Sequence, residues 1–260
     1  MGIPVLAYVV LWAPPVVMLA ALMLLAGVGG VELQRCVGGG ENRGMVLLSL
    51  LFPMLTTLCF GIFPPVFGCV LLCAEIVLLF ACAIVEGGRV KFNQLMAVFF
   101  ASLFLGYSFS AFLRIEAFGF HRAYLLLPFI LSFACDTFAY FAGRALGKHK
   151  LAPKVSPNKT IEGSVGGILG NIACGLLFAF VMGRWFDGTV GYGTMALLAL
   201  LCSVVAQIGD LSFSLIKREF GIKDYGRLFL EHGGVLDRFD SVLFVTPVVE
   251  IMLMLSLNLM

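Results

Sequence analysis

Two polar stretches interrupt this mostly apolar chain, and both are rich in residue types that handle phosphate. The first, residues 143–163, holds five basic residues; the second, Ser214–Asp240, holds five basic residues, five acidic residues and one histidine. Basic side chains can neutralise a triphosphate, carboxylates can hold the Mg²⁺ that accompanies it, and Gly233 and Gly234 would let the backbone approach an anion closely. The composition of the second stretch is therefore equally compatible with a nucleotide or polyphosphate site and with an ordinary charged loop.

Four acidic residues lie in or beside apolar blocks, at Glu75, Asp136, Asp210 and Glu250. An acid inside a bilayer is costly enough to need a partner or a function. Asp136 and Asp210 each lie near the end of an apolar block, ahead of one of the two polar stretches, where a metal or a phosphate would be accessible. Glu75 and Glu250 stand apart from other polar residues in the sequence, which favours a buried, hydrogen-bonded or boundary role for them.

The elements that must position these residues are membrane-spanning helices. Apolar residues make up 61% of the chain and charged residues 12%, against roughly 45–50% and 25% in soluble domains. The apolar residues fall into blocks near the length that crosses a bilayer, about 20 residues. About eight blocks can be drawn, within a range of about seven to nine; they are Ile3–Val28, Met45–Phe63, Val66–Val85, Gln94–Leu113, Ala123–Ala142, Ser164–Gly183, Thr194–Phe213 and Ser241–Leu257. We therefore predict an all-α, polytopic integral membrane helix bundle, in which Pro14-Pro15 and Pro64-Pro65 break or kink the helix.

The distribution of basic residues predicts the topology. Fourteen of the seventeen Lys and Arg residues lie in the loops after the first, third, fifth and seventh blocks, and three lie in the others, at Arg114, Arg122 and Arg184. Short cytoplasmic loops carry the positive excess, so both polar stretches are expected to face the cytoplasm. We expect an N-terminal transmembrane region over residues 1–122 and a C-terminal catalytic region over 123–260, in a bacterial inner (plasma) membrane.

Other classes of protein fit the sequence less well. A net charge of +2, with basic residues dispersed between apolar blocks, argues against nucleic-acid binding. The eight cysteines lack metal-ligand spacing and are interpreted as reduced packing residues. Two GxxxG spacings, formed by Gly163, Gly166, Gly167 and Gly170, are typical of close helix packing, either within the chain or in a homodimer.

The second polar stretch resembles the signature of the CDP-diacylglycerol synthase family, also called phosphatidate cytidylyltransferases. The matching positions are Ser214, Ile216, Lys217, Arg218, Lys223, Asp224, Gly226, His232, Gly233, Gly234, Val235, Asp237, Arg238, Phe239 and Asp240. The run SPNKTIEG, residues 156–163, is similar to the family's Ser-Pro-x-Lys-Thr-x-x-Gly segment. Leu230-Glu231 departs from the family's Pro or Gly followed by a small residue, which affects the turn expected there. The resemblance covers about residues 130–245 of the sequence.

This resemblance implies an enzyme that transfers CMP from CTP to phosphatidic acid, giving CDP-diacylglycerol and pyrophosphate. It implies a Mg²⁺ site, with or without a second cation, whose ligands are Asp210 and Asp237. The other catalytic residues that it implies are Lys217, Arg218, Lys223, Asp224, His232, Arg238 and Asp240. The implied substrate-binding residues are Asp136, Ser156, Lys159, Thr160, Ser214, Gly233 and Gly234. A structural hydrogen bond remains an alternative for His232, and a helix-capping role remains one for Ser156, Lys159 and Thr160.

Two other functions fit parts of the sequence. A membrane transporter also uses several spans and intramembrane carboxylates, but it would place its polar groups near the midplane. A CTP-dependent lipid kinase would use the same nucleotide and membrane. The identity of the lipid product separates these functions from CDP-diacylglycerol synthesis.

Overall fold

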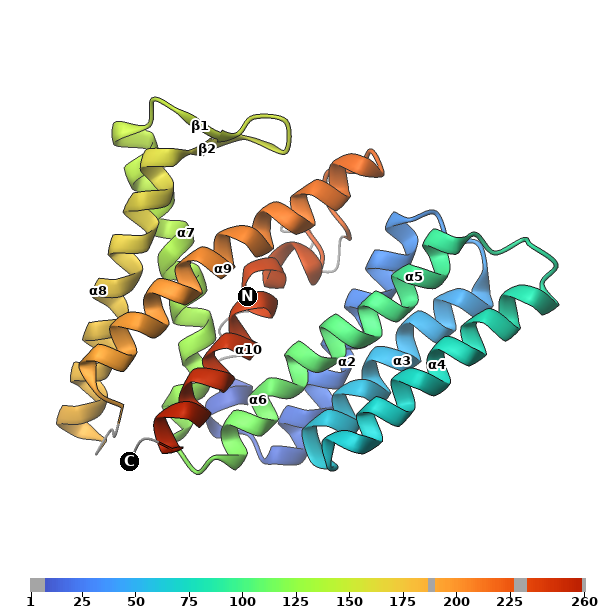
Figure 1. The fold of residues 1–260 in the computed structure, drawn as a ribbon, viewed down its shortest axis with the longest axis horizontal. Coiled ribbons are helices and arrows are strands. Elements are labelled where there is room, and N and C mark those ends of the chain that lie inside the picture. The colour runs from blue at the N-terminus through green and yellow to red at the C-terminus, as the bar shows by residue number, and fades with distance from the viewer. Residues whose placement is uncertain (1–7, 187–189, 227–232, 259–260) are drawn as a thin grey trace. The chain divides into compact units, whose positions relative to one another are not determined.

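The architecture is given by a computed structural model, which describes residues 8–186, 190–226 and 233–258 (Figure 1). The helices are α2 (Pro15–Cys36), α3 (Arg43–Ile62), α4 (Pro65–Val85), α5 (Phe92–Phe100), α6 (Tyr107–Ala117), α7 (Leu127–Leu146), α8 (Ile161–Trp185), α9 (Tyr192–Glu219) and α10 (Leu236–Asn258). A π-helical segment, Ala101–Gly106, joins α5 to α6, and a 3-10 turn, Arg122–Leu126, precedes α7. Two short strands, β1 (Lys150–Ala152) and β2 (Ser156–Thr160), lie between α7 and α8.

The described part of the chain contains eight helical segments long and apolar enough to cross a membrane, so the prediction of an all-α integral membrane protein with about eight spans is confirmed. The first span differs from its expected bounds, because it covers Pro15–Cys36 rather than Ile3–Val28. Pro14 precedes this helix and Pro15 occupies its first turn, where a missing N–H leaves no hydrogen bond unmade. Pro64 and Pro65 begin α4 in the same way.

The chain forms two compact units. The first unit contains Met1–Arg114 and Glu219–Phe239, and the second contains Ile115–Arg218 and Asp240–Met260. The polar stretch Ser214–Asp240 is therefore shared between the units, and each unit is described by itself. The expected division of the chain after residue 122 stays a prediction.

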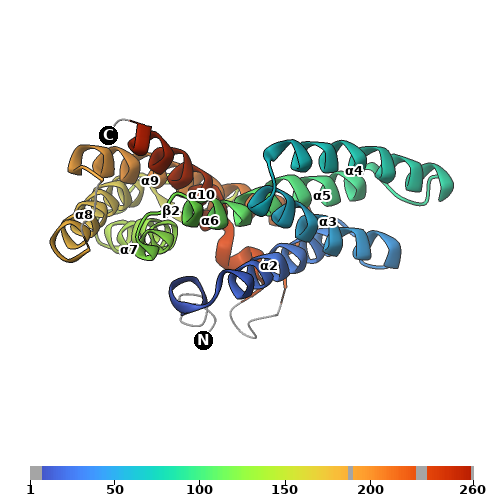
Figure 2. The same cartoon turned by 90° about the horizontal axis from the view of Figure 1, so that it is seen from below.

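In the first unit, α2, α3, α4 and α5 run side by side (Figures 1 and 2). A buried apolar cluster that includes Phe52, Leu79 and Val98 packs between α3, α4 and α5. Glu75 of α4 is also buried, and its Oε1 accepts hydrogen bonds from Ser102 Oγ at 2.8 Å and from Thr56 Oγ1 at 3.3 Å. These two hydroxyls satisfy one oxygen of the buried carboxyl group, and they confirm the buried, hydrogen-bonded interpretation of Glu75.

In the second unit, α7 and α8 pack closely because α8 presents glycines to α7. A Cβ on Gly163 would lie 2.7 Å from the Ala139 carbonyl oxygen, and one on Gly167 would lie 2.9 Å from the Cys135 carbonyl oxygen. The GxxxG face of α8 is therefore used for packing within the chain, and a homodimer stays a prediction. Asn171 of α8 links α8 to α9 by donating to the Ala199 carbonyl oxygen at 3.1 Å.

The first polar stretch is more ordered than a loop. β1 and β2 form an antiparallel hairpin in which Lys150 is opposite Thr160 and Ala152 is opposite Ser156 (Figure 1). This hairpin was not predicted from the sequence. It brings the chain from the end of α7 back to the start of α8 and holds the SPNKT segment in an extended conformation.

Candidate active site

A pocket of about 430 Å³ opens in the second unit, where the hairpin meets α7, α8 and α9. Five of the site residues expected from the sequence line it: Asp136, Ser156, Lys159, Thr160 and Asp210. Asp136 comes from α7, Asp210 comes from α9, and the other three come from β2. The fold thus brings together residues up to 74 positions apart that the sequence analysis had placed in one site.

Lys159 and Asp210 form an ion pair in this pocket. Their side chains are 25% and 26% exposed, so the pair is reached by solvent but is not fully solvated. Ser214, one helical turn after Asp210, donates its hydroxyl to Asp210 Oδ1 at 3.3 Å. Asp210 Oδ2 is the oxygen that faces Lys159. Both oxygens of Asp210 therefore have a partner, one cationic and one neutral.

Two further carboxylates lie near this ion pair. Ser241 Oγ donates to Asp136 Oδ2 at 3.5 Å, and Asp240 Oδ1 accepts the Ser241 N–H at 2.7 Å. Electrostatic interactions link Asp136 to Asp210 and Lys159, and they link Asp240 to Asp210, Asp136 and Lys217. Three carboxylates against two lysines leave an excess of acceptor oxygens, which favours a bound cation.

Thr160 has a capping role in addition to its place in the pocket. Its Oγ1 accepts the Gly163 N–H at 3.1 Å, which satisfies a free donor at the start of α8. The helix-capping alternative therefore holds for Thr160, and its contact with substrate stays a prediction. Ser156 begins β2 rather than a helix, so capping does not account for it.

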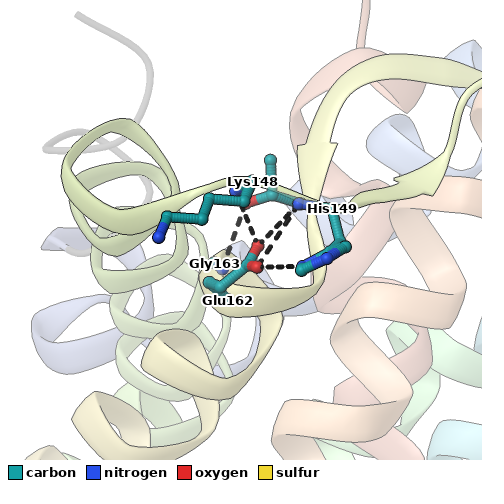
Figure 3. A network of polar contacts seen from close by, with 5 residues as sticks. Lys148, His149, Glu162 and Gly163 are labelled. Carbon is teal, nitrogen blue, oxygen red and sulfur yellow. Dashed lines mark hydrogen bonds and ion pairs between the residues drawn. The ribbon is translucent and has the colours of Figure 1, made fainter.

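Glu162 anchors the hairpin that carries Lys159 (Figure 3). Its Oε2 accepts the Lys148 N–H at 3.1 Å and the His149 N–H at 3.2 Å, and its Oε1 lies 2.6 Å from His149 Nδ1. These contacts join the first turn of α8 to the chain just before β1. Glu162 was not selected from the sequence, although an acid in the first turn of a helix is a recognisable signal.

Gln207 lines the pocket and was not selected from the sequence. It is buried on α9, three residues before Asp210, and its Nε2 donates to the Ser164 carbonyl oxygen at 3.5 Å. An amide in an otherwise apolar span, one turn from a selected acid, was the available signal. Gln207 thereby ties α9 to α8 beside the carboxylates.

Asp237 lies in the first unit and has a structural contact of its own. Its Oδ2 accepts the Tyr225 N–H at 2.8 Å and the Gly234 N–H at 3.0 Å. Asp237 therefore connects two points of the Ser214–Asp240 stretch (the signature segment), Tyr225 and Gly234, to the first turn of α10. Gly233 has a φ of +80°, a backbone conformation that favours glycine.

The remaining expected residues are placed as follows. Lys217 and Arg218 belong to the last turn of α9, in the second unit, so they are helical rather than part of a loop. Lys223 and Asp224 are exposed in the first unit, and Arg238 is exposed at the start of α10. His232 lies outside the described residues. Within the second unit, Lys217 and Arg218 are not among the residues that line the pocket.

The donor set of the pocket fits a hard cation. Its acceptor groups are carboxylate and hydroxyl oxygens, which are the ligands that Mg²⁺ prefers. Within the described ranges, no group of three or more His, Cys, Asp or Glu side chains is arranged to hold a metal ion. Mg²⁺ usually needs only one or two protein carboxylates, because waters and substrate phosphates complete its shell. Asp136 and Asp210, with the hydroxyls of Ser214 and Ser241 beside them, meet that requirement.

Comparisons with known proteins agree on one family. The model of the cytidylyltransferase family matches residues 1–256. A phosphatidate cytidylyltransferase of Staphylococcus haemolyticus is 38% identical over 176 residues, which are 68% of this chain and 65% of the relative. One of Staphylococcus epidermidis is 47% identical over 130 residues, 50% of this chain and 48% of the relative. One of Staphylococcus aureus is 38% identical over 173 residues, 66% of this chain and 64% of the relative. The chain thus spans less than two thirds of the length of these relatives.

Proposed function

The chain belongs to the cytidylyltransferase family, and from this premise we propose that it transfers CMP from CTP to phosphatidic acid, giving CDP-diacylglycerol and pyrophosphate. The names of its relatives support this reaction, as does the signature in Ser214–Asp240. The observation that carries the proposal is the pocket in which Lys159 pairs with Asp210 and which Asp136 also lines. Transfer of CMP from a triphosphate to a membrane lipid calls for cationic groups and metal-binding carboxylates close to the bilayer.

In the proposed reaction, an oxygen of the phosphatidate phosphate attacks the α-phosphorus of CTP. A new P–O bond forms, the bond to the bridging oxygen of the β-phosphate breaks, and pyrophosphate leaves with that electron pair. A phosphate monoester is already anionic near neutral pH, so the reaction needs little help from a general base. The tasks of the protein are alignment of the two phosphates and neutralisation of their charge.

Residues of the pocket can perform both tasks. Lys159 and Arg144 line it and would neutralise phosphate oxygens, and Gln207 stabilises the α8–α9 contact beside them. Bound Mg²⁺ would supply further positive charge against the triphosphate. The family resemblance proposes Asp210 of the pocket and Asp237 of the Ser214–Asp240 stretch as its ligands, and Asp136 adds a carboxylate on the α7 side of the pocket.

We propose a bacterial plasma membrane as the location, with the pocket facing the cytoplasm. The excess of Lys and Arg in the loops after the first, third, fifth and seventh apolar blocks supports this orientation. In a cysteine-free background, Lys154→Cys in the hairpin and Lys223→Cys in the signature segment should react only with a cytoplasmic thiol reagent. Arg184→Cys, at the end of α8, is the control and should react from the opposite side. Reaction of the first two variants from opposite sides would contradict the topology.

The function itself is tested with purified protein, radiolabelled CTP and phosphatidic acid over a Mg²⁺ titration. The expected product is CDP-diacylglycerol, identified by mass spectrometry, with release of one pyrophosphate per lipid. A phosphorylated lipid with release of CDP would instead identify a CTP-dependent lipid kinase. Binding of CTP without any lipid product would reject nucleotidyl transfer by this chain.

A further inference from the structure

Glu32 is a buried acid of α2 that the proposed reaction does not use. Its side chain reaches a segment 203 residues further along the chain, in the same unit. Glu32 Oε1 accepts the Val235 N–H at 2.9 Å, and Oε2 accepts the Leu236 N–H at 2.9 Å. Both carboxylate oxygens are therefore directed at the first backbone donors of α10.

This contact meets two needs of a helix start. The first N–H groups of a helix have no partner inside the helix, and the N-terminus carries partial positive charge that favours an anion. The residue is 5% exposed, so water replaces these hydrogen bonds poorly. A carboxylate can accept both N–H groups, whereas an amide in its place would turn its NH₂ group toward one of them.

Two glycines of the signature segment leave the space that Glu32 fills. A Cβ on Gly226 would lie 2.5 Å from Glu32 Oε1, and a Cβ on Gly234 would overlap the same carboxylate. These two glycines have negative φ or extended backbone rather than the left-handed conformation, since neither is among the positive-φ glycines. Close approach of Glu32 is thus a reason for glycine at both positions.

The segment that Glu32 holds also carries Asp237. The Gly234 N–H donates to Asp237 Oδ2, and the next two N–H groups in the chain donate to Glu32. Three consecutive backbone donors are therefore divided between two carboxylates. A shift of Glu32 would move the backbone from which Asp237 and Arg238 project.

We propose that Glu32 is a positioning residue, which fixes the start of α10 so that Asp237 and Arg238 are presented correctly for CMP transfer. The catalytic part of this inference rests on the proposed function. The structural part, that Glu32 holds the Val235 and Leu236 amides, can be tested without any activity.

The test compares Glu32→Gln with Glu75→Gln in the full-length protein, in detergent or nanodiscs. Glu75 is a matched control, because it is also a buried acid of the first unit, and the hydroxyls of Thr56 and Ser102 can adapt to an amide. Hydrogen exchange measured by mass spectrometry should show the Val235 and Leu236 amides exchanging about tenfold to a hundredfold faster in Glu32→Gln, the range expected for a lost charge-assisted hydrogen bond. The control should leave these amides unchanged.

The second readout is CMP transfer. Turnover by Glu32→Gln should fall at least about tenfold, and more Mg²⁺ should be needed for half-maximal activity, because Asp237 is the proposed ligand. When Glu32→Gln is combined with Asp237→Asn, turnover should fall little further than in Asp237→Asn alone, since both changes act on one segment. Glu75→Gln should retain the turnover and the Mg²⁺ dependence of the wild type.

The outcomes separate the inference from the proposed function. If the wild-type protein shows no CMP transfer, the proposed function is rejected. The exchange data would still decide whether Glu32 holds the Val235 and Leu236 amides. Exchange at Val235 and Leu236 that matches the wild type overturns the inference, as does faster exchange with unchanged turnover and Mg²⁺ dependence. If Glu32→Gln does not accumulate in membranes, Gly226→Ala displaces the same carboxylate and should give the same pattern. Failure of both variants to insert, with Glu75→Gln inserting normally, would make Glu32 a folding residue and reject the positioning role.

Discussion

Replacing Lys159 by alanine should impair CMP transfer more than any other single change in the hairpin. Lys159 is the cation that β2 places in the pocket, and it pairs there with Asp210. The change removes the proposed phosphate contact and leaves the carboxylates of Asp136 and Asp210 without this lysine. Phosphate would then approach a more negative pocket.

The size of the effect follows from the exposure of the pair. Two opposite charges about 4 Å apart attract by about 4 kcal/mol at an effective dielectric constant of about 20, which is an upper bound for a partly solvated site. Lys159 and Asp210 are 25% and 26% exposed, so screening reduces this value. Charge-assisted hydrogen bonds measured in proteins contribute about 1.5–3 kcal/mol. We therefore expect kcat/KM for CTP to fall about tenfold to 150-fold.

The assay is radiolabelled CTP incorporation into lipid by purified variants, with CTP varied at saturating phosphatidic acid. Lys154→Ala is the matched control, because Lys154 is an exposed lysine of the same hairpin that does not line the pocket. Lys159→Arg keeps the charge and should lose less than Lys159→Ala. If Lys159→Ala and Lys154→Ala differ by less than about twofold, a phosphate contact of the expected strength is absent.

Three further predictions concern the metal, the helix packing and the hairpin. Asp210→Asn and Asp237→Asn should each nearly abolish turnover over a Mg²⁺ titration, and the double variant should be hardly worse if both act at one metal; strictly multiplicative losses would contradict a shared metal. Gly167→Leu should destabilise the protein by about 1–3 kcal/mol through overpacking, because the new side chain meets the Cys135 carbonyl, and this should appear as a lower melting temperature in detergent. Gly183→Leu is the control: its side chain points into open space, so the melting temperature should not change. Glu162→Gln should increase hydrogen exchange at the His149 amide and reduce turnover, and unchanged exchange there would remove Glu162 as the hairpin anchor.

Much of the fold was predictable because it depends on the length of the apolar blocks and on the positions of the prolines. The length of the apolar blocks identified the spans, and the Pro-Pro pairs marked helix boundaries. The first span was misplaced because its apolar block runs continuously through Pro14, so hydropathy alone did not locate the start. The hairpin was missed because neither Lys150–Ala152 nor Ser156–Thr160 has the apolar alternation or the β-branched content of a typical strand.

Part of the candidate site was predictable, because two of its acids can be recognised from their position in the sequence. Asp136 and Asp210 were selected because each lies near the end of an apolar block ahead of a polar stretch, and both line the pocket. The family resemblance in the signature is confirmed by the match of the cytidylyltransferase family model to residues 1–256. Glu32 could not be selected, because its partners are backbone N–H groups 203 or more residues away, and backbone donors leave no signal in a sequence.

The turn between α3 and α4 has a consequence for how the protein enters the bilayer during synthesis. From Gly44 to Ala74 the chain carries no charged side chain, and Phe63-Pro64 is all that separates the two helices. Moving a charged residue through hydrocarbon is costly, whereas this turn has none to move. The two helices can therefore be inserted together as one helical hairpin, with Ile62 and Phe67 entering the membrane first. A single Lys placed at Phe63 would add an electrostatic barrier to that step while leaving both helices long enough to span.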